Sequence, residues 1–319
     1  MELFLSVVAL LTFAGFFVLA VSYVCYRLAF FVIRRKDEKK SKDLLTGLDW
    51  PFLDNYEPYK EQFEGWINAV RKLPFEEVST VSFDGLRLYG KFYKIKDDAP
   101  IELMFHGYRG SAERDLSGWV EGCYKIGHNA LVVDQRSSGK SEGKVITFGI
   151  NEHKDCLAWI NFTTKHFGDD VKIILTGISM GASTVLMAAG CELPKNVIGV
   201  IADCGYSSAR DIIKRVMRLM AMPADALYPF VRLGAMLYGK FDPDKTSPKK
   251  ALRECHVPVI FFHGETDRFV PCEMSRINFD ACASKKRLVT VPKAGHGLSY
   301  PVDPERYITS LQEFLEEVG

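Results

Sequence analysis

The residue types and spacing most able to do chemistry occur in the segment GISMG at 177–181. This segment follows an apolar run (172–176) and precedes a helical pattern (182–190), which is typical of a sharp turn from a strand into a helix. Such a turn needs small residues on both sides of its central serine, and it presents the hydroxyl at the N-terminus of the helix. We therefore predict that Ser179 is a nucleophile.

A serine hydroxyl is a weak nucleophile at neutral pH and needs a base that is itself oriented by an acid. At this kind of turn the partners follow in the order serine, acid, histidine. Asp267 ends the motif HGETD, which follows the apolar run 258–262, and His296 lies in PKAGHG, which follows the run 287–291. Because sites in open α/β sheets gather at the carboxyl ends of the strands, we predict that these two residues meet Ser179 as acid and base.

Other titratable residues could fill these two roles. His256 and His263 also follow the serine, but they stand at the two ends of one predicted strand, so neither is placed to reach the serine. Asp203 also ends a predicted strand, and Glu265 is two residues from Asp267. Both carboxylates therefore remain alternatives for the acid.

Acyl transfer also needs hydrogen-bond donors for an oxyanion, normally the amide after the nucleophile and one from the loop after an earlier strand. The apolar run 101–105 continues into HGYRG, so we predict the backbone N–H groups of Tyr108 and Met180 as the donor pair. His106 is an alternative base, but its position before a glycine favours a role in stabilising the loop. The Tyr108 hydroxyl could donate a further hydrogen bond to the oxyanion, or the side chain could only pack against its neighbours.

The segment DQRSSGKS (134–141) resembles a phosphate-binding loop, but Asp134 stands where that loop needs its first glycine. The sequence has no Gly-x-Gly-x-x-Gly motif opening a helix, no HExxH motif and no histidine-carboxylate cluster. We therefore expect neither a nucleotide nor a metal, and the predicted chemistry requires no cofactor.

The elements that must position these residues are short apolar runs that alternate with helical patterns. Continuous apolar runs suit parallel strands buried on both faces, and this alternation predicts a doubly wound, mostly parallel sheet. An alternating pair of strands about Asp84-Gly85 predicts an antiparallel hairpin at one edge. The predicted strands lie at 76–83, 86–93, 101–105, 130–134, 172–177, 197–203, 258–262 and 287–291, and the predicted helices at 57–73, 112–126, 152–167, 180–191, 273–283 and 304–318.

Some fifty residues separate the strand that ends at Asp203 from the one that begins at Pro258, too many for one crossover. Two amphipathic stretches within them predict a helical cap over the site, at about 205–250. Apolar side chains of this cap could line an acyl pocket or merely pack the cap onto the core. They are Met217, Met220, Met222, Tyr228, Phe230, Met236 and Tyr238.

Leu3 to Tyr26 contain no charge, and as a helix these 24 residues would be about 36 Å long, enough to cross a hydrocarbon core of about 30 Å. A secretory signal peptide is the alternative, but its first residues should be basic, and here they are Met1-Glu2. The flank from Arg27 to Lys42 is rich in lysine and arginine, so the positive-inside rule predicts a single span with the remaining domain in the cytoplasm. Residues 28–33 are expected at the interface.

The overall composition is that of a globular protein with one apolar segment added. Of the 319 residues, 47% are hydrophobic and 25% charged, with a net charge of +1, which argues against a nucleic-acid partner. The eight cysteines include no Cys-x-x-Cys pair, so we expect reduced thiols of a reducing compartment.

Together the motifs HGYRG, DQRSSGKSEG, GISMGAS, HGETDRFVP and AGHG resemble the α/β-hydrolase superfamily over about residues 77–319. The resemblance is closest to bacterial single-span hydrolases described as serine aminopeptidase-like or lysophospholipase-like. It implies the same nucleophile, acid, base and oxyanion loop, at Ser179, Asp267, His296 and Tyr108. The sequence departs from the family at Ser137, where the related loop usually has a glycine.

These observations predict a membrane anchor with its basic flank (1–35), a linker with a covering helix (36–76) and an α/β-hydrolase domain (77–319). The predicted activity is hydrolysis of a carboxylic ester of an amphiphilic or lipid-like small molecule through an acyl-enzyme. Amide or peptide hydrolysis and thioester hydrolysis use the same three residues and remain alternatives. A non-catalytic, membrane-bound ligand-binding module of the same fold is the alternative of another class.

Overall fold

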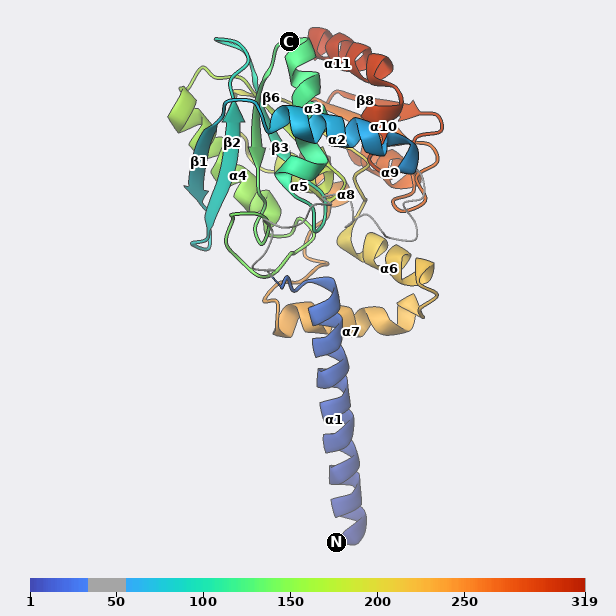
Figure 1. Ribbon diagram of the computed structural model, residues 1–319. Helices are drawn as coiled ribbons and strands as arrows, with labels where there is room; N and C mark the ends of the chain where they lie inside the picture. The colour runs from blue at the N-terminus through green and yellow to red at the C-terminus, as the bar shows by residue number, and fades with distance from the viewer. Residues whose placement is uncertain (34–55, 319) are drawn as a thin grey trace.

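A computed structural model describes residues 1–33 and 56–318 of the chain. The predicted linker and most of the basic flank lie outside the described residues. The described part forms an eight-stranded sheet in the order β1-β2-β4-β3-β5-β6-β7-β8 (Figure 1). The strands are β1 (Glu76–Val81), β2 (Arg87–Tyr93), β3 (Ile101–Phe105), β4 (Asn129–Val133), β5 (Ile173–Ile178), β6 (Val197–Asp203), β7 (Val259–Gly264) and β8 (Lys286–Val291).

The sheet is parallel apart from its first two strands. β1 and β2 form an antiparallel hairpin, and β2 pairs antiparallel with β4, while every later pairing is parallel. The central strands are buried on both faces, which is why β3 and β4 read as apolar runs interrupted only by Glu102 and Asn129. The predicted doubly wound sheet with an antiparallel edge is therefore confirmed.

Helices cover both faces of the sheet. On one face α3 (Ala112–Ile126) and α11 (Pro304–Val318) pack with α2 (Lys60–Val70), which follows the short turn η3 (Glu57–Tyr59), and with α10 (Ser299–Val302). On the other face lie α4 (Glu152–Phe167), α5 (Met180–Ala189) and α9 (Glu273–Ala281), with α8 (Pro248–Ala251) and the turn η4 (Leu252–Glu254) beside them. The outer helices are amphipathic because only one face of each meets the sheet, whereas α5 is buried along its whole length and has no charged residue.

Two helices, α6 (Ala209–Leu219) and α7 (Ala224–Leu237), form the insertion between β6 and β7. Tyr228 and Met217 are buried against the body, but Met220, Met222 and Met236 are exposed. Most of the cap methionines therefore do not line an enclosed acyl pocket, because they face away from the packed core.

The first helix, α1 (Glu2–Ala29), projects from the body, and α7 lies across its C-terminal end (Figure 1). The two helices approach closely at Gly234, where a Cβ atom would stand 2.2 Å from the Ser22 carbonyl oxygen. Ser22 is the first buried residue of α1. An 18-residue window of the helix has a mean hydropathy of 2.6 and contains no buried residue. The helix is thus long and apolar enough to cross a membrane.

The sequence predicts residues 28–33 at a membrane interface, and the structure leaves Leu28 and Ile33 exposed but packs the middle of the segment against the body. Phe30 is fully buried, with edge-to-face contacts to Phe148 and Phe241, and Phe31 pairs as an isolated bridge with Val145. The sequence alone could not show this, because an apolar stretch beside a membrane helix has the same composition whether it meets lipid or protein.

Candidate active site

Ser179 lies at the turn between β5 and α5, with φ 56° and ψ −116°. An L-residue adopts this positive φ only under strain, which costs of the order of 1–3 kcal/mol. The turn is possible because Gly177 and Gly181 have no side chain, and the neighbouring backbone leaves no room for one at either position. A Cβ on Gly177 would lie 2.3 Å from the carbonyl carbon of Gly181, and one on Gly181 would lie 1.9 Å from the Phe105 carbonyl oxygen.

The structure brings together the three side chains that the sequence singled out. His296 Nε2 lies 2.9 Å from Ser179 Oγ, and His296 Nδ1 lies 2.7 Å from Asp267 Oδ2. The three residues follow β5, β7 and β8, which lie at one end of the sheet in the order β5-β6-β7-β8. Their convergence therefore follows from strand order, since all four strands are parallel and end at the same edge.

Asp267 is buried and held by four groups. Its Oδ1 accepts the backbone N–H groups of Phe269 (2.9 Å) and Val270 (2.8 Å), and its Oδ2 meets His296 and, at 3.2 Å, His263 Nε2. Burial by itself raises the pKa of this carboxyl group, but the charge of His296 and the hydrogen bonds from both histidines lower the pKa to about 2. Asp267 is therefore an anion at neutral pH.

His296 shows the reciprocal effect. Burial by itself lowers the pKa of the imidazole, but the charge and the hydrogen bond of Asp267 outweigh it and raise the pKa above its ordinary value. The carboxylate thus stabilises the imidazolium form, which is the form a general base adopts after taking a proton.

His263 is a contact of the site that the sequence analysis considered only as a base. It lies within β7, which continues to Gly264, and its imidazole is fully buried between Ser275 Oγ (2.6 Å), the Val270 carbonyl oxygen (2.8 Å) and Asp267. It does not bond to Ser179 and instead orients the acid. The signal in the sequence was its place four residues before Asp267, at the end of an apolar run.

Asp203, the alternative acid, accepts a hydrogen bond from Ser299 Oγ (2.8 Å) rather than from the imidazole of His296. Burial raises its pKa to about 6. Its backbone carbonyl accepts the N–H of Ser179 at 2.8 Å, so this residue supports the turn. Glu265, the other alternative, accepts a hydrogen bond from Thr290 Oγ1 at 2.7 Å.

The loop after β3 runs past the serine. A Cβ on Gly107 would lie 3.6 Å from Ser179 Cβ, so the backbone of this loop borders the hydroxyl. The Gly107 N–H already donates to Asp115 Oδ2 at 2.9 Å, whereas the Tyr108 and Met180 N–H groups donate to no acceptor among the described residues. The Tyr108 phenol points elsewhere, because it donates to the Ala29 carbonyl oxygen of α1 at 2.7 Å.

His106 has both ring nitrogens within hydrogen-bond distance of neighbouring loops. Its Nε2 accepts the Gln135 N–H at 3.1 Å and its Nδ1 lies 2.8 Å from the Gly107 carbonyl oxygen. The Gln135 side chain in turn donates to the His106 carbonyl oxygen at 2.6 Å. The imidazole thus joins the loop after β3 to the loop after β4.

The segment that resembles a phosphate-binding loop is filled by its own side chains. Asp134 Oδ2 accepts the Lys140 N–H at 3.0 Å, and a Cβ on Gly139 would collide with the Asp134 carboxylate at 2.0 Å. Ser137, where the related family has a glycine, has φ 69°. That positive φ explains the usual glycine and makes the serine a strained residue.

One group of three possible metal ligands occurs among the described residues: Cys204, Asp267 and His296, whose ligand atoms lie within 4.8 Å of one another. Asp267 and His296 already bond to each other, and burial raises the pKa of the Cys204 thiol well above its ordinary value. A protonated thiol is a poor ligand, so this donor set does not suit a metal ion.

Comparisons with known proteins agree with this architecture. A model of the α/β hydrolase fold matches residues 103–256. An esterase of Pyrococcus furiosus superposes with a TM-score of 0.65 at 24% identity, covering 79% of this chain and 94% of that one.

Curated relatives also match. Protein YqkD of Bacillus subtilis, an uncharacterised protein, is 26% identical over 256 residues, 77% of this chain and 82% of that protein. A thiohydrolase of Arthrinium phaeospermum is 33% identical over 135 residues, 40% of this chain and 42% of that protein. The chain therefore has the α/β-hydrolase fold, and these matches support its place in the α/β-hydrolase superfamily.

Proposed function

We propose that this chain is a membrane-anchored serine hydrolase that cleaves a carboxylic ester through an acyl-enzyme on Ser179. The observation that carries the proposal is the unbroken hydrogen-bonded series from Asp267 through His296 to Ser179 at a strained strand-to-helix turn. Each member has the property its role needs: an ionised acid, a histidine whose protonated form is stabilised, and a nucleophile at a helix N-terminus.

In the proposed mechanism Ser179 Oγ attacks the ester carbonyl carbon while His296 Nε2 takes the hydroxyl proton. Asp267 holds the Nδ1–H, which fixes the tautomer and stabilises the imidazolium. The Tyr108 and Met180 amides stabilise the oxyanion. His296 then donates the proton to the leaving alcohol, and a water molecule, deprotonated by the same histidine, releases the carboxylic acid and restores the serine.

The proposed anchor is α1, with the catalytic domain on the cytoplasmic side. From Glu2 to the first buried residue, Ser22, about 20 residues project freely, which as a helix is about 30 Å and matches a hydrocarbon core. The eight cysteines are all free thiols, which favours a reducing compartment. This placement favours an amphiphilic substrate that reaches the site from the bilayer.

A labelling experiment tests the catalytic role. The detergent-solubilised full chain is treated with a fluorophosphonate probe, and labelling of the wild type with none of Ser179→Ala is the expected result. An unreactive wild type with an intact fold by circular dichroism would instead favour the non-catalytic binding module.

The bond that is cleaved requires a second experiment, because an ester, a thioester and an amide share the mechanism. The thiohydrolase relative makes a thioester the first competitor. One acyl group is offered as a p-nitrophenyl ester, as a thioester and as an aminoacyl amide, and the acyl chain is then lengthened in steps. The proposal predicts the highest kcat/KM for an ester with an apolar chain, and a higher value for the amide would contradict it.

The proposed topology is testable without an activity assay. Membranes that contain the full chain are washed with alkaline carbonate and then treated with protease from either side. Retention in the membrane and digestion only from the cytoplasmic side are expected. Release of a shortened soluble chain would support the signal-peptide alternative.

A further inference from the structure

We propose that a pocket beside the end of α1 binds the phosphate headgroup of an anionic membrane lipid, at a site separate from the candidate active site. The pocket has a volume of about 820 Å3, and Ser179, His296 and Asp267 do not line it. The inference rests on the proposed anchoring by α1, and on the positions of four lysines. These are Lys144, Lys154, Lys240 and Lys245.

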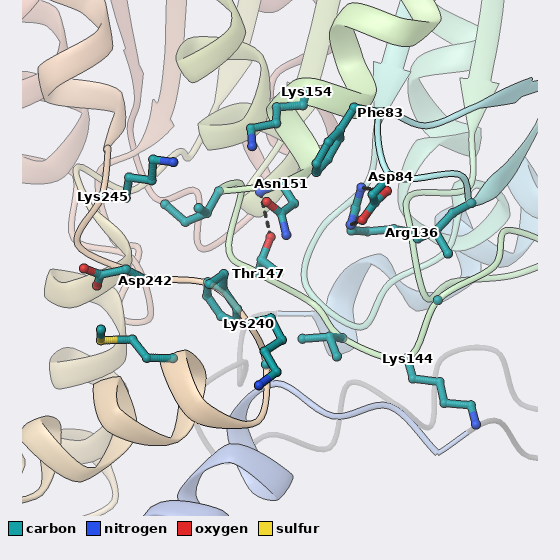
Figure 2. Close-up of a pocket in the computed structure, with 17 residues that line it drawn as sticks. Phe83, Asp84, Arg136, Lys144, Thr147, Asn151, Lys154, Lys240, Asp242 and Lys245 are labelled. Carbon is teal, nitrogen blue, oxygen red and sulfur yellow. Dashed lines mark hydrogen bonds and ion pairs between the residues drawn. The ribbon is translucent and has the colours of Figure 1, made fainter.

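The pocket lies where three segments meet. The hairpin turn after β1, the segment from Gly143 to Lys154 and the chain after α7 supply most of its walls, and Arg136 and Met236 complete them (Figure 2). Its size falls within the range of pockets that hold small molecules. Its apolar lining, which includes Ile150 and Phe241, offers a surface on which a glycerol backbone or acyl chain can rest.

The positive charge of the four lysines is not neutralised by carboxylates of the described residues. Among the described residues, none of the four lysines has a carboxylate partner within ion-pair distance, and Lys154 only stacks its ammonium group 4.3 Å above the Phe83 ring. The two acids in the lining are already engaged. Asp84 pairs with Arg136 at 3.0 Å and Asp242 with Arg232 at 2.7 Å.

Figure 2 shows Lys144 extending away from the other three lysines. Among the described residues, Lys154, Lys240 and Lys245 have no carboxylate partner, so they bring like charges to one pocket, and a bound anion would reduce their repulsion. In Figure 2, Lys154 and Lys245 extend from opposite walls near Asn151, at the start of α4, while Lys240 lies nearer to α1.

The backbone N–H groups of Thr147 and Gly149 before α4 already donate to the Glu152 carboxylate, so the helix N-terminus is not available to a ligand. The ammonium point charges and the Asn151 amide are the groups that favour a phosphate here.

The position of the pocket beside the end of α1 favours a lipid as the source of the phosphate group. Tyr238, which precedes this segment, stacks edge-to-face on Tyr23 at 5.1 Å, and both lie where α1 would leave the bilayer. Aromatic side chains with lysine and arginine mark the interface level of membrane proteins. The backbone of Lys144 also accepts the Val32 N–H at 2.9 Å, so the pocket wall is bonded to the chain that continues the anchor.

A headgroup bound here would fix the rotation of the domain on the membrane. One apolar helix holds the chain in the bilayer but leaves the body free to turn about the helix axis. A second contact, away from the axis of α1, removes that freedom. Because anionic lipids attract interfacial lysines, this contact is expected to depend on salt.

Titration of the full chain in dodecyl maltoside micelles tests the inference. Isothermal calorimetry measures the half-saturating concentrations of dihexanoyl phosphatidylglycerol, dihexanoyl phosphatidylcholine and inorganic phosphate. We expect phosphatidylglycerol to bind at least tenfold more tightly than the other two. The variant K154Q/K240Q/K245Q is expected to raise its half-saturating concentration at least tenfold.

The matched control is K165Q/K172Q/K195Q, which removes the same charge from three exposed lysines at the opposite ends of the strands. Equal binding by the pocket variant and the wild type, or an equal loss in the control, would overturn the site. Inorganic phosphate binding as tightly as the lipid would overturn the lipid source.

The same preparations separate this inference from the proposed function. Fluorophosphonate labelling of Ser179 is expected to be unchanged in K154Q/K240Q/K245Q, because none of these lysines contacts the three candidate catalytic residues. Lost lipid binding with retained labelling supports the pocket, whereas retained labelling with unchanged lipid binding refutes the pocket alone.

Discussion

Replacing Gly181 with alanine should separate the geometry of the oxyanion loop from the presence of the catalytic side chains. The added Cβ would stand 1.9 Å from the Phe105 carbonyl oxygen and 2.8 Å from that of His106, and real Cβ atoms essentially never come closer than 3.0 Å to a neighbour. Both neighbours are backbone, so α5 and the loop after β3 must separate by about 1.1 Å.

That separation acts directly on the predicted oxyanion donors. Met180 precedes Gly181, and Tyr108 follows His106 by two residues, so the shift moves the two amides apart. A misplacement of about 1 Å can lower a rate by about 100-fold, and loss of one oxyanion donor lowers kcat by about 100- to 1,000-fold. We therefore expect kcat for the best p-nitrophenyl ester to fall by about 100-fold.

The matched control is Gly190→Ala, at the other end of α5. Its Cβ would lie 2.2 Å from the Ala251 carbonyl oxygen, a backbone overlap of similar severity but remote from Ser179. Both variants are expected to lose about 1–3 kcal/mol of stability in thermal or urea unfolding. If Gly181→Ala kept kcat within threefold of the wild type, or if both variants lost kcat equally, the predicted role of the loop would be wrong.

Three further predictions concern the site. Asp267→Asn should lower kcat by about 10,000-fold, because the neutral amide no longer fixes the tautomer of His296; a loss below tenfold in steady-state turnover would argue against its role. The pKa of His296 is raised above its ordinary 6.5, and only the neutral imidazole accepts a proton, so log kcat/KM should fall as the pH drops through this raised pKa. A profile of log kcat/KM that is flat down to pH 5 would contradict this. Tyr108→Phe should cost about 1 kcal/mol in urea unfolding through its lost bond to the Ala29 carbonyl oxygen and leave kcat unchanged, since the predicted oxyanion donor is the backbone amide; a large loss of kcat would instead assign the phenol to the chemistry.

The positions of the strands could be predicted from the sequence because the signals are local. The apolar runs, the Asp84-Gly85 turn and the glycines about Ser179 each act within a few residues. The order of the strands in the sheet depends on more distant parts of the chain. Strands that alternate with helices, and that carry polar motifs after their carboxyl ends, are nevertheless compatible with only a few orders. The candidate nucleophile, acid and base could therefore be named from the sequence, and the structure places their side chains in contact.

The contacts of β7 show what local patterns omit. His263 reads as the end of an apolar run four residues before Asp267, but this spacing alone does not predict that its ring reaches the Asp267 carboxylate while bonding to Ser275. A side chain's partner across a loop depends on how two segments pack, and several packings fit the same pattern of polar and apolar residues.

By itself the sequence determined the alternation of strands and helices, the residues of the turn at Ser179 and an apolar first helix. The tertiary structure alone decided that Phe30 packs into the body, that Tyr108 bonds to the end of α1 and that four lysines from two distant segments line one pocket. The physical reason is the distance along the chain over which each effect acts. Periodicity and backbone strain act between near neighbours, whereas burial and charge balance depend on segments that only the folded chain brings together.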